Sequence, residues 1–383
     1  MYNKKLNRND LCWCGSNIKY KKCHLGRDKQ KPKESWEVSR EFNRGFSRCI
    51  CSSPEKLHHE CDKKIIKAHT VPKSSSLKAI AENGHVLGLK MTLESIFKFK
   101  GTPQLEKIGI NNASVFNGFC KKHDDSFFAS IEKSNFKNTL EQCFFLAYRS
   151  FSREYYTKTS ALETSYLRHQ ADKGKSIYSQ IDIQHNNFFT DLGTKFALND
   201  LFYHKKFFDE SILTKDYSNI RAVVFTLETA PPVMVSGGVN PDYNFRGELI
   251  QDLMNFEKYS ELLSVTSFFD GSYGKIVFSW LKNSELVCEN LIRTLFEKNN
   301  NDIPAFLVQF IIKNIENFYI SPKWWDSMNE ENKEILLSLI EDTVSLTSEP
   351  SAFGLNTKLL DIEFPSILSI DFINWDLKGH VRD

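Results

Sequence analysis

The chain contains a short cysteine-rich stretch near its start, residues 9–24, which reads NDLCWCGSNIKYKKCH. Four soft metal ligands fall within thirteen positions of this stretch, namely Cys12, Cys14, Cys23 and His24. Three thiolates and one imidazole fill the four positions of a tetrahedral zinc ion, and a site with no open position is typical of a structural metal. The spacing therefore predicts a small zinc knuckle, in which Gly15 permits the tight turn after the first cysteine pair.

The same stretch resembles the SEC-C motif, a small zinc module found at the C-terminus of the SecA translocation ATPase and in many otherwise unrelated bacterial proteins. The resemblance covers residues 7–26 and rests on the order Arg8-Asn9-Asp10, Cys12-x-Cys14-Gly15-Ser16 and Lys19-Tyr20-Lys21-Lys22-Cys23-His24. It departs from the motif at Leu11, where a proline is usual, and at Trp13, and neither change removes a ligand. The resemblance implies the same four zinc ligands and a docking or targeting role, and it implies no reaction.

A second set of metal-type residues lies between positions 49 and 132. A short β-branched run ends at His69 in the segment AHTVP (residues 68–72), where the proline stops it. The later segment NGFCKKHD (residues 117–124) places Cys120 and His123 so that both can grip one metal from a turn or a helix start. These residues predict a second metal site, for which the chain also offers Cys49, Cys51, His58, His59, Cys61 and His85.

This second region resembles an HNH, or ββα-metal, nuclease unit. The resemblance implies that His69 is the general base at the end of a strand, that Cys120 and His123 form one zinc pair, and that Cys51 and Cys61 supply the other. It also implies that Asp124 and Asn117 act at the catalytic centre, with Mg²⁺ or Mn²⁺ for phosphodiester hydrolysis. The gap between His69 and Cys120 is longer than in the compact motif, and residues 76–84 predict an inserted, capped helix stopped by Asn-Gly.

A simpler interpretation of the second region needs no catalysis. His69, Cys61, Cys120 and His123 would all ligate one structural zinc ion, which would leave no general base. The chain would then be a non-catalytic adaptor whose zinc modules dock a ribosome, a chaperone or another protein partner. The sequence leaves both interpretations open.

The remainder of the chain predicts an α+β fold. Aromatic and apolar residues at helical spacing extend from residue 140 to about 208, and later helices are expected at 286–296, 303–317 and 329–346. A small antiparallel sheet is expected from strands at 219–227, 233–238, 262–269 and 275–280. The resulting domains are a knuckle (1–28), a basic linker (29–45), an HNH-like unit (46–135) and a C-terminal α+β domain (136–383).

Charge and cysteine content indicate the cellular compartment and the kind of partner. The formal net charge is only +2, but residues 1–40 contain eleven Lys and Arg against four Asp and Glu, so the positive charge is local. Such an arm suits nucleic acid, DNA or RNA, or an acidic protein surface. No stretch is apolar over the length of a membrane span, and nine cysteines, most of them at ligand-like spacing, fit a reducing, cytoplasmic compartment. Architectures of this kind are associated with bacterial phage defence.

Overall fold

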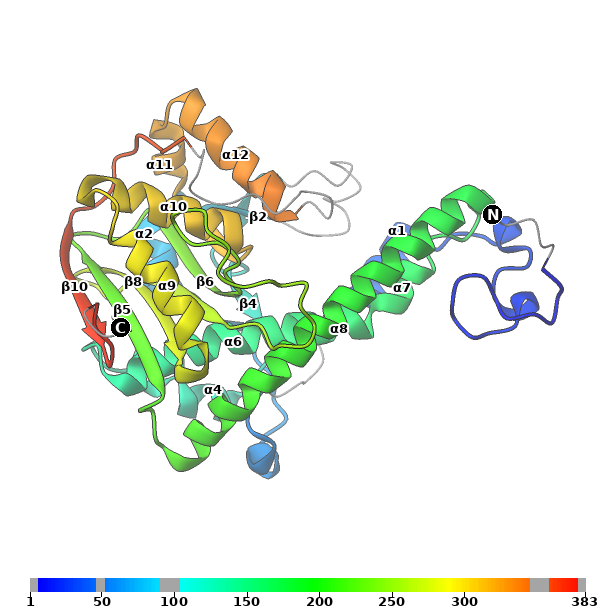
Figure 1. Cartoon of the computed structure of the whole chain (residues 1–383), viewed down its shortest axis with the longest axis horizontal. Helices are drawn as coiled ribbons and strands as arrows, with labels where there is room; N and C mark the ends of the chain where they lie inside the picture. The colour runs from blue at the N-terminus through cyan, green and yellow to red at the C-terminus, as the bar shows by residue number, and fades with distance from the viewer. Residues whose placement is uncertain (1–5, 46–51, 90–103, 345–357, 378–383) are drawn as a thin grey trace. The chain divides into compact units, whose positions relative to one another are not determined.

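The structure, a computed structural model, describes residues 6–45, 52–89, 104–344 and 358–377, and Figure 1 labels its helices and strands. The chain divides into two compact units. Unit 1 comprises residues 1–48 and 157–199, and unit 2 comprises residues 49–156 and 200–383. This division differs from the four consecutive segments expected from the sequence, because each unit is assembled from two separate parts of the chain.

Unit 1 combines the cysteine-rich stretch with helices that come much later in the sequence. Its elements are the 3₁₀ turns η1 (Tyr20–Lys22) and η2 (Arg27–Lys29), the helices α1 (Ser35–Gly45) and α7 (Ser165–His169), and the first part of the long helix α8 (Ile177–Thr214). Residues 29–45, expected to be a linker, therefore contain a helix. The N–H of Gly174, just before α8, donates to the carbonyl of Arg27 at 3.0 Å. This bond ties the end of the knuckle to the turn between α7 and α8.

Unit 2 is built on an antiparallel sheet, which has eight strands in the part of the chain that the structure describes. The strand order is β10-β5-β8-β7-β6-β9-β2-β3. The strands are β2 (His85–Leu89), β3 (Leu105–Gly109), β5 (Ile220–Leu227), β6 (Val233–Val239), β7 (Leu263–Phe269), β8 (Gly274–Leu281), β9 (Phe318–Ile320) and β10 (Ile367–Ile373). Strands β5 to β8 lie close to their expected ranges. The sheet is larger than expected because segments from before and after this block extend both of its edges.

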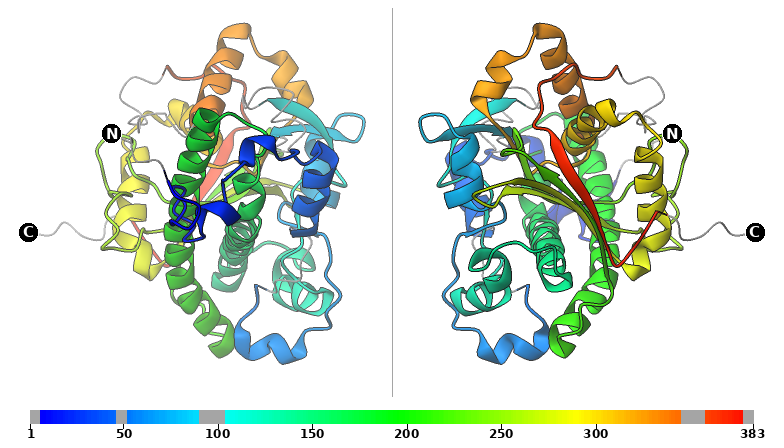
Figure 2. Two further views of the ribbon diagram at one scale, coloured as in Figure 1. Left: turned by 90° about the vertical axis from the view of Figure 1, so that its right-hand side faces the viewer. Right: turned by 90° about the vertical axis from the view of Figure 1, so that its left-hand side faces the viewer.

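Helices cover both faces of this sheet (Figure 2). Helices α9 (Glu285–Leu295), α10 (Ile303–Asn314) and α12 (Glu330–Val344) share one apolar core with the sheet, and all three lie close to their expected ranges. Helix α6 (Leu140–Glu163) packs on the opposite face, where Ser150 Oγ lies 2.9 Å from Ser236 Oγ and 3.1 Å from Thr266 Oγ1. Strands β6 and β7 therefore present hydroxyl groups to the interior covered by α6.

Residues 52–132 form a ββα arrangement whose insertion belongs to the large sheet. Strand β1 (Ala68–His69) pairs antiparallel with β4 (Val115–Phe116), and helix α4 (Lys121–Phe127) follows, with α5 (Ala129–Glu132) after it. The intervening segment supplies β2 and β3. The helix expected at 76–84 is shorter than predicted. A π-helical turn (Lys73–Leu77) leads into α2 (Lys78–Ile80), and the Asn83-Gly84 turn, with positive φ at both residues, begins β2 instead.

The remaining elements are short, and several apolar side chains lie at the surface of unit 2. These elements are the 3₁₀ turns η3 (Glu55–Glu60), η5 (Lys282–Ser284) and η6 (Asn300–Asp302), and the short helix α11 (Pro322–Ser327). Ser321 caps α11 by accepting from the N–H of Trp324, as the Ser-Pro pair predicts.

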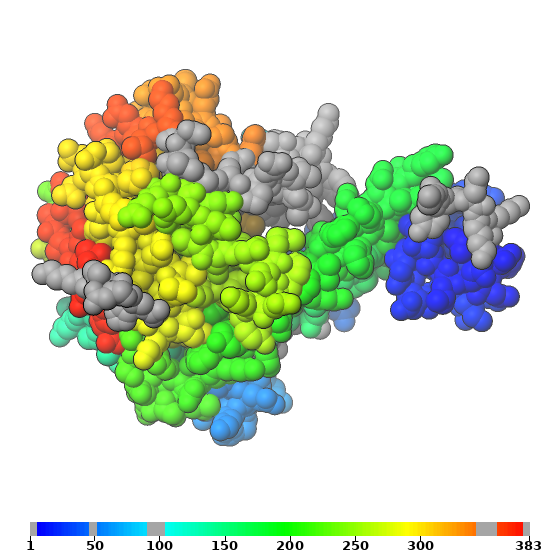
Figure 3. Space-filling view, in the orientation of Figure 1, coloured from blue at the N-terminus to red at the C-terminus, as the bar shows by residue number. Residues whose placement is uncertain are grey.

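Residues 240–262 lie beside α9 at the surface, where Leu249 and Met254 are 60% and 73% exposed (Figure 3). Among the described helices, none is long and apolar enough to cross a membrane.

Candidate metal centres

A tight hairpin presents the first two cysteines of unit 1. Leu11 and Lys19 form an antiparallel bridge, and the N–H of Cys12 donates to the carbonyl of Ile18 at 2.8 Å. The N–H of Gly15 donates to the carbonyl of Cys12 at 3.3 Å, and the glycine has a φ of +74°. A side chain at this backbone conformation would be strained, so the C-x-C-G pattern places both thiols on one turn.

A 3₁₀ turn presents the other two ligands. The N–H groups of Cys23, His24 and Leu25 all donate to the carbonyl of Tyr20, at 3.0 to 3.1 Å. This convergence folds the chain back immediately after η1, and it directs adjacent side chains at positions 23 and 24 toward the hairpin. The four expected ligands therefore meet because two local turns face each other.

The four ligand atoms have the spacing of a tetrahedral metal cradle. One ligand atom from each of Cys12, Cys14, Cys23 and His24 lies within 4.8 Å of all the others. His24 Nδ1 is 3.1 Å from Cys12 Sγ and 3.1 Å from Cys23 Sγ, and the Sγ atoms of Cys14 and Cys23 are 3.6 Å apart. Sulfur ligands at about 2.3 Å from zinc are about 3.8 Å apart in a tetrahedron. The donor set and its dimensions thus fit zinc.

Burial and hydrogen bonding act differently on two of these thiols. Burial raises the pKa of the Cys12 thiol to about 12. Burial also disfavours the Cys14 thiolate, but hydrogen bonds from His24 and Ser16 outweigh it and lower the Cys14 pKa to about 6. Without metal, protons are therefore carried by Cys12 and by His24, and zinc would displace them from Cys12 Sγ and His24 Nδ1 on binding.

The imidazole of His24 has a buried carboxylate as its outer partner. His24 is 5% exposed, and its Nε2 lies 2.7 Å from Oδ2 of Asp172, whose side chain has no exposed surface. Arg27 and Gln184 also donate to this carboxylate, at 2.6 and 2.7 Å. Burial raises the pKa of Asp172, but these hydrogen bonds outweigh it and hold the pKa below its usual value. No pattern in the sequence indicated Asp172, which lies 148 positions from His24.

A second Cys/His cluster lies in unit 2, where the segment after Cys61 runs beside β4 and α4. Ile65 and Cys120 form an antiparallel bridge, and the N–H of Lys121 donates to the carbonyl of Lys64 at 3.0 Å. A side chain at Gly118 would collide with the ring of Phe116, 2.3 Å from the position of its Cβ. The NGFC sequence therefore permits the close turn that brings Cys61 and Cys120 together.

Three of the expected ligands converge in this second cluster. Ligand atoms of Cys61, Cys120 and His123 all lie within 4.8 Å of one another, and Cys120 Sγ is 3.4 Å from His123 Nδ1. Cys120 also caps α4, because its sulfur accepts from the backbone N–H of His123. Two thiolates and an imidazole suit zinc. The expected fourth ligand, Cys51, lies outside the described residues, as does Cys49.

His69 does not join this second cluster. It ends β1 opposite Val115, and it is absent from the group formed by Cys61, Cys120 and His123. Its Nε2 is buried and has no hydrogen-bond partner among the described residues. The structure therefore does not support the interpretation in which His69 is a ligand of the structural zinc.

A group of buried charged side chains lies around His69 and Asp124. Asp124 on α4 is 8% exposed, and its Oδ1 has no hydrogen-bond partner in the described part of the chain. Arg149 on α6 is 2% exposed, pairs with Glu132 at 2.6 Å, and lies 4.0 Å from the ring centroid of Phe128. The charges of Arg149 and Glu132 shift the pKa of both His69 and Asp124. We call these four residues, His69, Asp124, Glu132 and Arg149, the buried quartet after its two buried members, Asp124 and Arg149; His69 is half-buried and the Glu132 side chain is 37% exposed.

Burial sets the protonation of two members of the quartet. It lowers the pKa of His69, and the charges of Lys73 and Arg149 lower it further, so the ring is neutral at pH 7. Burial raises the pKa of Asp124 to about 6, against the opposing charge of Arg149. Asn117, the third expected catalytic residue, directly follows β4 and is half-buried. The sequence of α6 favours a solvated face for its basic residues, but the structure buries Arg149, and no pattern in the sequence marked Glu132.

Comparison with known proteins identifies one module. The SEC-C motif matches residues 8–26, which contain all four ligands of the first centre. No curated protein and no solved structure shows significant similarity to the chain. The SEC-C motif binds zinc, and the two Cys/His clusters could each hold a zinc ion. The comparisons give no support for an HNH nuclease and assign no specific function.

Proposed function

We propose that the protein is a metal-dependent nuclease of the HNH type, in which zinc at the second centre holds a ββα scaffold. The observation that carries the proposal is the position of His69. It ends the first strand of a ββα arrangement, outside the Cys61–Cys120–His123 cluster, and its buried Nε2 has no partner in the described part of the chain. A scaffold zinc separate from a histidine at this position is what phosphodiester hydrolysis by this kind of unit requires.

The chemistry assigned to His69 is that of a general base. The ring is neutral at pH 7, so one of its nitrogens carries a lone pair, and we assign that lone pair to Nε2, which has no hydrogen-bond partner among the described residues. This nitrogen would accept a proton from water, and water activated in this way attacks phosphorus in line with the leaving oxygen.

Asp124 supplies an oxygen ligand for a divalent cation. Its Oδ1 is buried and has no partner among the described residues, and Mg²⁺ and Mn²⁺ prefer such oxygen ligands. Mg²⁺ is commonly held by one or two carboxylates together with water and substrate phosphate. A cation held there would stabilise charge on the leaving oxygen. Because the pKa of Asp124 is raised to about 6, ligation and cleavage should increase with pH across this value.

The basic N-terminal stretch would provide contacts with the phosphate backbone. Residues 1–40 carry eleven Lys and Arg against four Asp and Glu, and the SEC-C motif lies within them. Neutralised phosphates release counterions, so binding should weaken steeply as salt increases. Nucleic acid, DNA or RNA, is therefore the proposed substrate class.

The test compares His69→Ala with His59→Ala, which removes a histidine whose side chain is 75% exposed. Purified protein is incubated with plasmid DNA and with RNA in Mg²⁺ or Mn²⁺, and its zinc content is measured. We expect His69→Ala to reduce cleavage by about 10²- to 10⁴-fold, the usual contribution of a general base, with zinc unchanged. His59→Ala should cleave like the wild type. Cleavage by His69→Ala at the wild-type rate, or no cleavage by the wild type on either substrate, would refute the proposal.

A second candidate function, docking of a protein partner, is favoured by one surface of unit 1. A cavity of about 710 Å³ is lined mainly by apolar and aromatic side chains, among them Trp13, Leu25, Ile181 and Phe188. Phe188 is 55% exposed, and exposed apolar patches of this kind often contact other proteins. In this alternative the two zinc centres are scaffolds of an adaptor. Loss of zinc from the second centre on His69→Ala, together with no cleavage by the wild type, would favour it.

A further inference from the structure

The first zinc centre is connected to residues far outside the SEC-C motif. The motif matches residues 8–26, whereas Asp172 lies in the turn between α7 and α8. Its Oδ2 is 2.7 Å from His24 Nε2, and its side chain has no exposed surface. Arg27 Nε donates to Oδ1 at 2.6 Å, and Gln184 Nε2 donates to Oδ2 at 2.7 Å. Both carboxylate oxygens are therefore saturated by fixed donors.

These contacts fix which nitrogen of His24 can bind metal. Asp172 is an acceptor, so the proton of the imidazole must be on Nε2, and the lone pair is on Nδ1. Nδ1 is the nitrogen that lies 3.1 Å from the sulfur atoms of Cys12 and Cys23. A carboxylate behind a ligating histidine orients the ring and increases its basicity. Asp172 thus meets the geometric conditions for this role.

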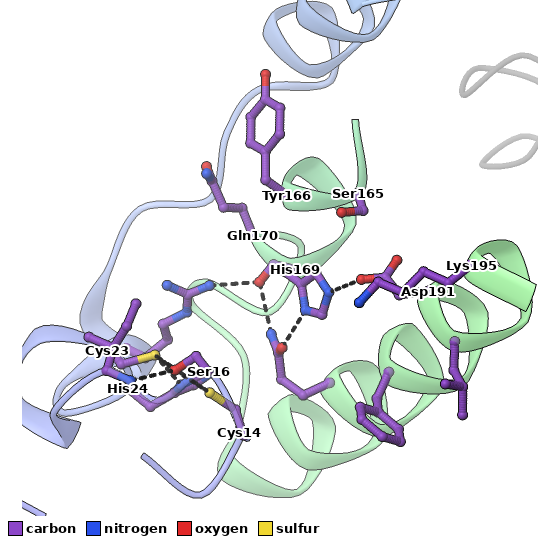
Figure 4. A pocket seen from close by; sticks show the side chains of 16 residues that line it. Cys14, Ser16, Cys23, His24, Ser165, Tyr166, His169, Gln170, Asp191 and Lys195 are labelled. Atoms are coloured by element: carbon purple, nitrogen blue, oxygen red, sulfur yellow. Dashed lines mark hydrogen bonds and ion pairs between the residues drawn. The ribbon is translucent and has the colours of Figure 1, made fainter. Parts of the chain in front are cut away.

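The carboxylate is itself held by a continuous hydrogen-bonded chain on α7 and α8. Gln184 Nε2 also donates to the carbonyl of His169, and its Oε1 lies 2.7 Å from His169 Nδ1. His169 Nε2 continues to Asp191 at 2.8 Å. Figure 4 shows His24 beside the cysteines on one side of a cavity, and His169 pointing toward Asp191 on the other. The position of Asp172 therefore depends on the packing of both helices.

We propose that Asp172 is the positioning residue of the first zinc centre, which makes the SEC-C module and the α7–α8 turn a single zinc-dependent unit. The metal is held by the knuckle, but its histidine is oriented from 148 positions away. Coupling of this kind is reciprocal, so zinc binding must also stabilise the α7–α8 turn. The proposal is independent of the nuclease function, because every residue in it belongs to unit 1.

The first test measures zinc affinity in the full chain. Asp172→Asn is nearly isosteric and removes the charge, and Glu41→Gln makes the same change in an ion pair with Lys33 elsewhere in unit 1. Competition with a chelator should show that Asp172→Asn lowers the affinity for one of the two zinc ions by about 10- to 100-fold. This is the effect expected when a hydrogen-bond partner of a ligating histidine is lost. Glu41→Gln should leave both zinc ions unchanged. An affinity of Asp172→Asn within twofold of the wild type would overturn the proposal.

A second test measures the reciprocal effect. Hydrogen exchange of residues 165–186 is compared between Cys23→Ser, which removes a ligand of the first centre, and Cys120→Ser, which removes a ligand of the second. We expect faster exchange only in Cys23→Ser. Equal protection in both variants would contradict the proposal, because zinc binding at the knuckle would then not stabilise the α7–α8 turn. Cobalt substitution gives a further readout, since Asp172→Asn should shift the visible bands of the first centre while its helical content is retained.

Discussion

The two metal centres use similar ligands but differ in what surrounds them. In the first centre, the four ligands lie within thirteen residues, and the carboxylate behind His24 comes from the turn between α7 and α8. In the second centre, Cys61 lies 59 positions before Cys120, and the buried quartet lies nearby without joining the metal ligands. Local turns build the first centre, whereas long-range packing builds the second.

This difference indicates how each centre should respond to substitution of its residues. The first centre has a complete donor set whose outer partner is saturated, which is the condition of a structural site. In the buried quartet, three side-chain atoms are buried without partners in the described residues, His69 Nε2, Asp124 Oδ1 and Arg149 Nε, whereas the first centre has one such neighbour, Trp13 Nε1. Unpartnered buried polar atoms reduce stability, and they are retained most often where they serve chemistry. Three predictions sharpen this comparison.

The largest expected effect is loss of the second zinc from Cys120→Ser. Structural zinc ions contribute about 10–16 kcal/mol of apparent binding free energy, and Cys120 both ligates and caps α4. Metal analysis should find one zinc per chain, and hydrogen exchange should increase in residues 61–128. Cys288→Ala, which alters a fully buried cysteine outside both clusters, serves as the control and should retain two zinc ions. Two zinc ions in Cys120→Ser would contradict the assignment of this ligand.

An intermediate effect is expected from Asp124→Asn in the buried quartet. The folded-state pKa of Asp124 is raised from 3.8 to about 6, so its protonated form favours folding at low pH, and this contribution is lost as pH rises through about 6. A shift of about two units corresponds to about 3 kcal/mol. Because asparagine stays neutral, the variant should be more stable than the wild type at pH 8 by up to about 3 kcal/mol, and by about half as much at pH 5.

Urea unfolding with zinc retained and Mg²⁺ absent measures this difference in the free energy of unfolding. The neighbouring variant Asp125→Asn is the matched control, because Asp125 is exposed and should show no such pH dependence. A wild type that is as stable as Asp124→Asn at pH 8 would show that Asp124 has a charge partner in solution. The quartet would then resemble the saturated carboxylate of the first centre.

The smallest expected effect is that of Ser16→Ala at the first centre. Ser16 Oγ lies 3.2 Å from Cys14 Sγ and 3.4 Å from Cys23 Sγ, and its hydroxyl can donate to a zinc-bound thiolate. Loss of one such bond costs about 1 kcal/mol, which is about a fivefold change in zinc affinity. Chelator competition should detect this change at one zinc only. Ser338→Ala, at an exposed position on α12, should change neither zinc.

The sequence by itself determined the features that depend on neighbours along the chain. The ligands of the SEC-C motif could be named because two short turns bring them together, and such turns leave a spacing that can be read directly. Strands β5 to β8 were predictable for a similar reason, since each is a short run rich in β-branched and aromatic residues that can be recognised locally. The capped start of α11 at Ser321 is equally local.

Only the tertiary structure decided the features that join distant segments. Asp172 and Arg149 are ordinary charged residues in the sequence, and each becomes important because the fold buries it beside a partner from another part of the chain. The segment between His69 and Cys120 could not be assigned to the large sheet, because β2 and β3 find their place through β9, more than two hundred residues later. Spacing records contacts made within a turn, whereas contacts between packed elements depend on the free energy of the whole fold.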